Sequence, residues 1–146
     1  PLEKLGLDPS LTYLAYDFWK QKYLGEVKGK LHWETLNFGH TTVIALREKL
    51  DRPQLVGSTR HVSMDVESVE DIKWKSPTLK LKLKCVPNTE EIYTFRAPSN
   101  YKFAEVACSN GSAKKLDSSN ESSEIVKIAV KAKAKNIVLD LKFAND

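Results

Sequence analysis

A two-residue alternation of apolar and charged side chains sets the strongest limit on the fold of this chain. From Leu79 to Cys85, every odd position is apolar and every even position is a lysine. A similar alternation runs through 126–134, and 137–143 carries Ile, Leu, Leu and Phe at alternate positions. Because successive side chains of a β-strand point to opposite faces, this pattern predicts half-buried strands.

Read along the whole chain, the pattern predicts an all-β fold. We expect about ten short antiparallel strands packed as β-sandwiches, with an immunoglobulin-like C-terminal part. Two hairpins are predicted, one joining 92–95 to 101–106 and one joining 126–134 to 137–143. The polar segment 110–123 is expected to be a long surface loop.

The composition around 48–53 changes from an apolar strand to charges and a proline, which predicts a boundary between two β units. We expect these units to span 1–50 and 54–146. The chain of 146 residues opens with Pro1 and shows neither an initiator Met nor a signal pattern, so a piece of a longer protein is expected. No apolar stretch approaches the roughly 20 residues of a membrane span, so no membrane-spanning segment is expected.

The charge balance is mildly basic, with 23 Lys+Arg against 19 Asp+Glu. Lysines at alternate strand positions share one face, and we favour a solvated face over a phosphate-binding one, with no nucleic-acid partner. Cys85 and Cys108 fit neither a CxxC pair nor a disulfide framework. One bridge and two buried thiols both remain open, and small buried core residues are favoured.

The sequence lacks the spaced motifs of nucleotide and metal chemistry. His32, His40 and His61 lie too far apart to form a metal site defined by spacing, and there is no P-loop or G-x-G-x-x-G. Carboxylates such as Asp17 and Asp65 are interpreted as solvated acids rather than as a catalytic pair. No cofactor and no metal are expected.

Aromatic residues are the more informative candidates, because five of them crowd into one short segment. They are Tyr13, Tyr16, Phe18, Trp19 and Tyr23. An exposed indole offers a large rigid surface on which the apolar face of a sugar stacks. Trp19, Trp33 and Trp74 are therefore the candidate carbohydrate-binding residues, although a core or interface role for these rings is favoured.

Several segments of the first half resemble the terminal β domain of α-galactosidase-type glycoside hydrolases. They are Leu5-Gly6-Leu7-Asp8, Tyr16-Asp17-Phe18-Trp19, Tyr23-Leu24-Gly25 and Thr42-Val43-Ile44-Ala45-Leu46-Arg47. The family's His-Gly turn is reversed here in Phe38-Gly39-His40. The stretch from Arg52 to Trp74 is similar to an extra C-terminal β module found in bacterial members.

The resemblance implies a non-catalytic role for this chain. In the family, the catalytic aspartates lie on an N-terminal (β/α)₈ barrel of some 250 residues, which this chain is too short to contain. No catalytic residue is carried over, and we expect this chain by itself not to be an enzyme. The implied partner is the barrel of the same polypeptide, the implied ligand is a galactose-containing glycan, and the implied location is periplasmic or extracellular.

Two alternative functions stay open. One is a dedicated carbohydrate-binding module, and the other is an immunoglobulin-like protein-interaction or adhesion domain. The resemblance begins partway into the family's domain, so we expect an open sheet edge around residues 11–33, where a homodimer would form by strand pairing.

Overall fold

The computed structural model describes residues 1–33 and 38–145. The described chain is all-β apart from one short 3-10 helix, η1 (Leu2–Leu5), which confirms the predicted fold class. The strands are β1 (Thr12–Asp17), β2 (Lys22–Lys28), β3 (Ile44–Glu48), β4 (Gln54–Ser58), β5 (Val69–Lys75), β6 (Thr78–Lys84), β7 (Glu90–Arg96), β8 (Tyr101–Cys108), β9 (Gly111–Lys115), β10 (Ile125–Ala132) and β11 (Asn136–Asn145).

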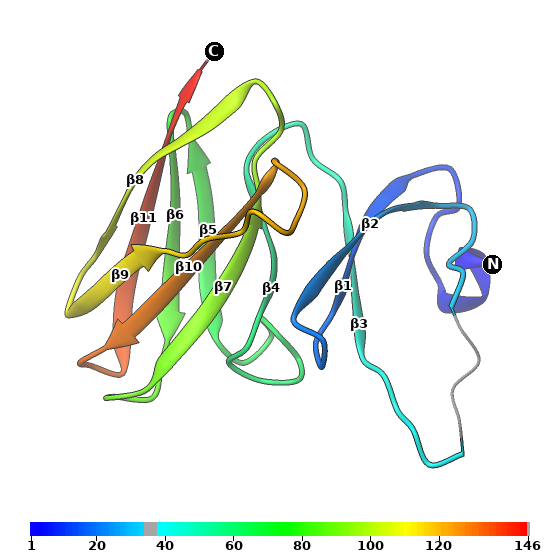
Figure 1. Ribbon diagram of the computed structural model, residues 1–146, viewed down its shortest axis with the longest axis horizontal. Coiled ribbons are helices and arrows are strands. Elements are labelled where there is room, and N and C mark those ends of the chain that lie inside the picture. Colours follow the sequence, from blue (N-terminus) through cyan, green and yellow to red (C-terminus); the bar gives the residue numbers. More distant parts are fainter. Residues whose placement is uncertain (34–37, 146) are drawn as a thin grey trace.

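The strands form three antiparallel sheets stacked as three layers (Figure 1). The N-terminal sheet has the strand order β2-β1-β3, the middle sheet β4-β7-β10-β9, and the outer sheet β5-β6-β11-β8. The middle and outer sheets make the predicted β-sandwich. An immunoglobulin-like type for this sandwich stays a prediction, as does the division of the chain into two domains.

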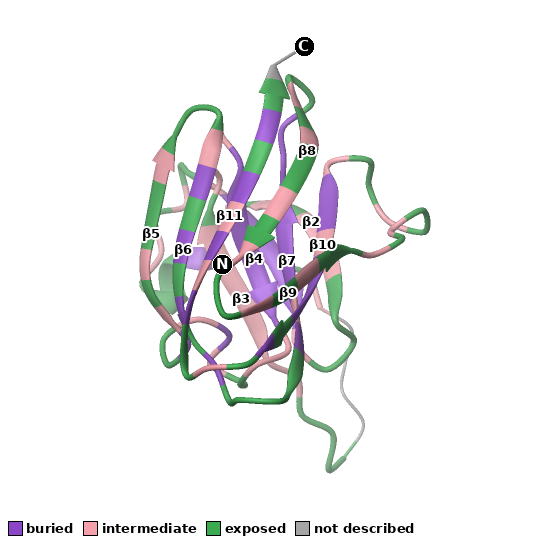
Figure 2. Cartoon of the chain, turned by 90° about the vertical axis from the view of Figure 1, so that its left-hand side faces the viewer, coloured by how far each residue is buried: buried purple, intermediate pink, exposed green. Residues whose placement is uncertain are grey.

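The main core lies between the middle and outer sheets and follows from the alternation in the sequence. In β6 the three leucines are fully buried while the lysines between them are exposed. Along β11, buried residues alternate with half-buried and exposed ones (Figure 2). The largest fully buried side chains of this core are Leu79, Leu81, Leu83, Tyr93, Phe95, Ile128, Leu139, Leu141 and Phe143.

A second, smaller core joins the N-terminal sheet to the middle sheet. Leu14 and Tyr16 of β1 pack with Val56 of β4 and with Met64, and all four side chains are buried. Every residue of β4 is buried, because one of its faces meets the main core and the other meets the N-terminal sheet. Strand β4 is therefore covered on both of its faces.

Both predicted hairpins are wrong. β7 belongs to the middle sheet and β8 to the outer sheet, and the same is true of β10 and β11. β10 pairs with β7 and β9, whereas β11 pairs with β6 and β8. The alternation identifies each segment as a strand with one apolar face, but two such strands can face the same core from opposite sheets. Their short connections then cross from one sheet to the other.

The segment 110–123 differs in part from the predicted surface loop. Its first residues form β9, which pairs with β10 from Gly111 opposite Ala132 to Lys115 opposite Ile128. Because it pairs with the long, buried strand β10, this segment forms a strand although its own β propensity is low. Only the part after Lys115 remains a loop.

The two cysteines are free thiols, one buried (Cys85) and one half-buried (Cys108). The disulfide bridge, one of the two alternatives left open by the sequence, is therefore not formed. Both cysteine side chains pack with the main core.

Candidate functional site

Trp74 packs within the sandwich. Its ring lies edge-on to Tyr101, with centroids 5.5 Å apart, and at 6.2 Å from Phe143. It is half-buried and packs against the main core. The ring is thus engaged by other aromatic side chains rather than standing free as a flat surface.

Trp19 lies in the turn between β1 and β2 and is 60% exposed. Its main neighbour is Phe18, which meets it edge-to-face with ring centroids 4.9 Å apart. Of the three predicted tryptophans, this one offers the most open ring.

Trp33 follows β2 along the chain and is half-buried. The ammonium of Lys20 lies 5.3 Å from its ring centroid, within the range of a cation–π interaction. Together with residues of β2 the two side chains line a shallow depression of about 570 Å³. Through Lys20 the structure brings the Trp19 turn next to Trp33, whereas Trp74 lies beyond the middle sheet.

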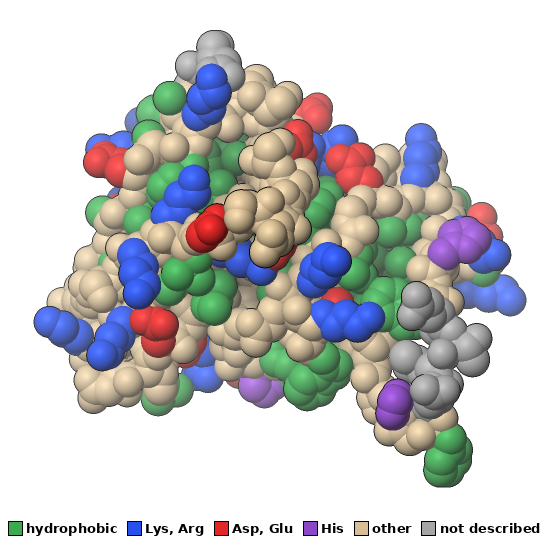
Figure 3. Space-filling model, viewed as in Figure 1, with side chains coloured by type: hydrophobic (Ala, Val, Ile, Leu, Met, Phe, Trp, Pro, Cys, Tyr) green, Lys and Arg blue, Asp and Glu red, His purple; other side chains and the backbone are tan. Residues whose placement is uncertain are grey.

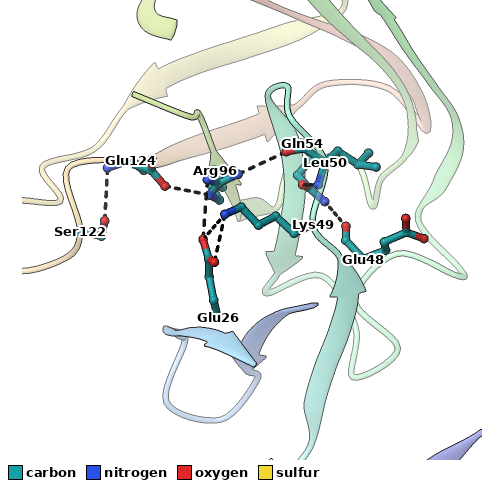
Figure 4. Close-up of polar contacts among 8 residues, drawn as sticks. All are labelled: Glu26, Glu48, Lys49, Leu50, Gln54, Arg96, Ser122 and Glu124. Carbon is teal, nitrogen blue, oxygen red and sulfur yellow. Dashed lines mark hydrogen bonds and ion pairs between the residues drawn. The ribbon is translucent and has the colours of Figure 1, made fainter. Parts of the chain in front are cut away.

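A buried arginine ties the N-terminal sheet to the sandwich. Arg96 of β7 is only 4% exposed, and its Nε lies 2.8 Å from Oε2 of Glu124 (Figure 4). Its Nη1 donates to the carbonyl of Leu50 at 3.3 Å, and its Nη2 lies 3.7 Å from Oε1 of Glu26 on β2. Glu26 also pairs with Lys49 at 2.8 Å. Sequence patterns did not single out this group, because its members are far apart in the chain.

Two further polar contacts fix the same junction. Arg47 of β3 donates from Nε to the carbonyl of Val56 at 2.7 Å and from Nη1 to Asp65 at 2.5 Å. Lys127 of β10 donates to the carbonyl of Gln21 at 3.0 Å. Together with the second core, these contacts hold the N-terminal sheet against the sandwich at several separate points.

The N-terminal part of the chain carries large apolar side chains on its surface. Leu5 is in η1, Leu11 precedes β1, Trp19 is in the β1–β2 turn, and Phe38 is fully exposed. Residues in irregular segments produce no periodic signal, and of these four only Trp19 is a predicted binding residue. Exposed apolar groups of this size mark candidate interaction surfaces.

Strand β2 is an edge of the N-terminal sheet, since it pairs with β1 alone. It lies within the segment where an open edge is predicted. Lys22 and Lys28 are exposed on it, and its pairing with β1 shifts register between Ala15 and Tyr16. Lysines and irregular pairing are typical protections of an edge against association, and a homodimer through this edge stays a prediction.

Among residues 1–33 and 38–145, no group of three or more His, Cys, Asp or Glu side chains is placed to hold a metal ion. No helix in the described part of the chain is long and apolar enough to cross a membrane.

The fold and these surfaces define the class as an all-β sandwich protein with an added N-terminal sheet. Comparison of the chain with protein-family models, with curated proteins and with solved structures found no match.

Proposed function

We propose that this chain is the non-catalytic C-terminal β region of a periplasmic or extracellular glycoside hydrolase of the α-galactosidase type. In this proposal, the N-terminal sheet packs against the catalytic (β/α)₈ barrel of the same polypeptide. The sequence resemblance in the segments 5–8, 16–19, 23–25 and 42–47 supports this class of parent enzyme.

The observation that carries the proposal is that, among the described residues, both exposed aromatic side chains lie around the N-terminal sheet. Trp19 and Phe38 lie in separate connections of that sheet and both extend into solvent. One face of the sheet already packs on the sandwich through Leu14 and Tyr16. A partner that covers the exposed side chains would bury apolar surface at about 25 cal/mol per Å².

The role proposed for the region is mechanical support. Because Arg96 and the second core fix the N-terminal sheet to the sandwich, a barrel that binds this sheet would also position the whole sandwich. Contact between the sandwich and the glycan substrate is proposed as a second role.

The proposal is tested first by the coding sequence upstream of Pro1 and by activity. A (β/α)₈ pattern is expected upstream, and the chain of 146 residues alone is expected not to hydrolyse an aryl α-galactoside. Hydrolysis by the isolated chain at a rate comparable with that of the longer polypeptide would contradict the proposal, as would an upstream sequence without the barrel pattern.

A second test examines the packing surface in the longer polypeptide. The double variant Trp19→Ser/Phe38→Ser is expected to lower the temperature at which the enzyme loses activity. Val66→Ser, a change of an apolar side chain that is 81% exposed in the connection between β4 and β5, is expected to leave that temperature unchanged. Equal effects of the two changes would argue against a barrel on the N-terminal sheet.

A further inference from the structure

A cleft lies at the end of the sandwich where β8 and β9 diverge. The two strands leave a common turn at residues 109–110 but belong to different sheets, so the space between them widens along the strands (Figure 1). The loop 116–124, which joins β9 to β10, forms the second wall. The cleft measures about 760 Å³, within the range of small-molecule sites in proteins.

One wall of the cleft is aromatic. Tyr101 and Phe103 of β8 line it and are half-buried. Behind the cleft, Tyr101 packs edge-on to Trp74, and Phe103 packs edge-on to Phe143 at 6.0 Å. These contacts hold both rings in place. Hydrophobic side chains and a basic side chain are visible in the hollow beside the loop (Figure 3).

The other wall is polar and held by its own hydrogen bonds. Ser118 donates from Oγ to the carbonyl of Ile125 at 3.0 Å, and the backbone N–H of Glu121 donates to the carbonyl of Ser118 at 2.9 Å. The backbone N–H of Ser119 donates to Oδ1 of Asp117 at 2.9 Å, a contact that lowers the pKa of this carboxyl. The carboxylate of Glu121 is paired with Lys127.

A cation and an anion both border the aromatic wall. The ammonium of Lys115 lies 5.6 Å from the ring centroid of Phe103, and Asp117 follows two residues later on the loop. The hydroxyl residues Ser119 and Ser122 line the same space. Two half-buried aromatic rings are thus opposed by donors and acceptors of both charges.

We propose that this cleft binds a neutral saccharide. The apolar C–H face of a sugar ring would pack on Tyr101 and Phe103, and its hydroxyls would donate to Asp117 and accept from Lys115. Opposite charges side by side favour a ligand with many hydroxyls and no net charge. The inference rests on the glycan contact of the proposed function but is independent of the packing on a barrel.

The test is a titration of the ¹⁵N-labelled chain with soluble galactomannan, xylan fragments and maltooligosaccharides, each followed by amide chemical shifts. We expect at least one saccharide to shift resonances of 99–103 and 115–124. Asp117→Ala is expected to weaken that binding about tenfold, as loss of one charge-assisted hydrogen bond does. Phe103→Leu removes the flat ring and is expected to weaken binding as well.

Two control variants leave the cleft intact: Asp51→Ala changes an exposed acid in the connection before β4, and Trp19→Ala removes the open ring of the N-terminal sheet. Both are expected to retain the affinity. Should Phe103→Leu fail to fold, Asp117→Ala decides, since Asp117 is exposed. The inference is overturned if none of the three saccharides shifts any resonance at millimolar concentration, or if the shifts map to Trp19 and Trp33. Neither result bears on the barrel, which the activity of the longer polypeptide tests.

Discussion

At the scale of single residues, the junction between the N-terminal and middle sheets depends on the absence of one side chain. Gly57 lies in β4 directly against the ring of Tyr16. A Cβ atom at Gly57 would lie 2.4 Å from Cδ1 and 2.6 Å from Cε1 of that ring, far inside van der Waals contact. Tyr16 is fully buried, so its ring has no free space into which to move.

The substitution Gly57→Ala is therefore expected to lower the free energy of unfolding by about 3 kcal/mol, because it overpacks the second core. Urea unfolding measures this value. In a Tyr16→Val background the ring is gone, and the same substitution is expected to cost much less. An equal cost in both backgrounds would show that the ring is not the cause.

Cys85 is a second residue whose surroundings have a measurable consequence. Its thiol is buried beside Tyr93, at 4.0 Å from the phenol oxygen, and Tyr93 donates to Glu91 at 3.0 Å. Burial, together with the negative charge of Glu91, raises the pKa of Cys85 from 9.0 to about 11. The folded state thus holds a proton that the unfolded chain releases first.

Since the folded pKa is the higher one, the contribution of Cys85 to stability is complete below pH 9 and is lost as the pH rises through about 11. We expect urea midpoints to fall between pH 9 and 11, and to fall less in Cys85→Ala over the same interval. Parallel pH profiles of the two proteins would exclude the thiol as the source.

At the scale of elements, β6 shows how alternation becomes burial. It lies between β5 and β11 in the outer sheet, so both of its edges are hydrogen-bonded. Leu79, Leu81 and Leu83 reach the main core, while Lys80 and Lys84 form cross-strand ion pairs with Asp140 and Glu70 on the open face. Exposed pairs of this kind contribute little to stability.

Neighbouring substitutions in β6 are therefore expected to differ widely. Leu81→Ala should lower the free energy of unfolding by about 3 kcal/mol through loss of burial and creation of a cavity. Lys82→Ala, one position along on the open face, should change it by no more than about 0.5 kcal/mol. Comparable losses in thermal or urea unfolding would mean that this face is covered in solution.

At the scale of the whole molecule, the middle sheet joins the three layers, because it packs against both of the other sheets. On one face of the middle sheet, Val56, Thr94 and Arg96 are buried. The N-terminal part of the chain covers this face through the second core and through the contacts that Leu50 and Glu26 make with Arg96. Removal of the N-terminal sheet would leave apolar groups and a buried guanidinium without cover. The sandwich and the N-terminal sheet should therefore unfold together.

Tryptophan fluorescence can test this cooperativity, since Trp33 reports on the N-terminal part and Trp74 on the sandwich. In Trp19→Phe/Trp33→Phe and in Trp19→Phe/Trp74→Phe, the urea midpoint of the remaining tryptophan is expected to match that of far-UV circular dichroism. A transition of Trp33 at clearly lower urea would indicate that the N-terminal sheet unfolds by itself.

Much of this structure follows from residue order alone. Alternation in 79–85 and 137–143 correctly predicts strands, their apolar faces and the all-β class, because burial on one face requires a period of two. The carbohydrate-binding role predicted for Trp19, Trp33 and Trp74 stays a prediction.

Strand pairing and the contacts between surfaces, in contrast, depend on the tertiary structure. A strand with one apolar face can close the core from either sheet, so the sequence does not distinguish a hairpin from a crossing connection at residues 133–135 or 97–100. Contacts such as Gly57 with Tyr16, or Arg96 with Glu26, join positions far apart in the chain. The cleft between β8 and the loop 116–124 likewise exists only because β8 and β9 belong to different sheets. Local patterning therefore determines the elements, whereas packing between distant segments determines their arrangement and the sites between them.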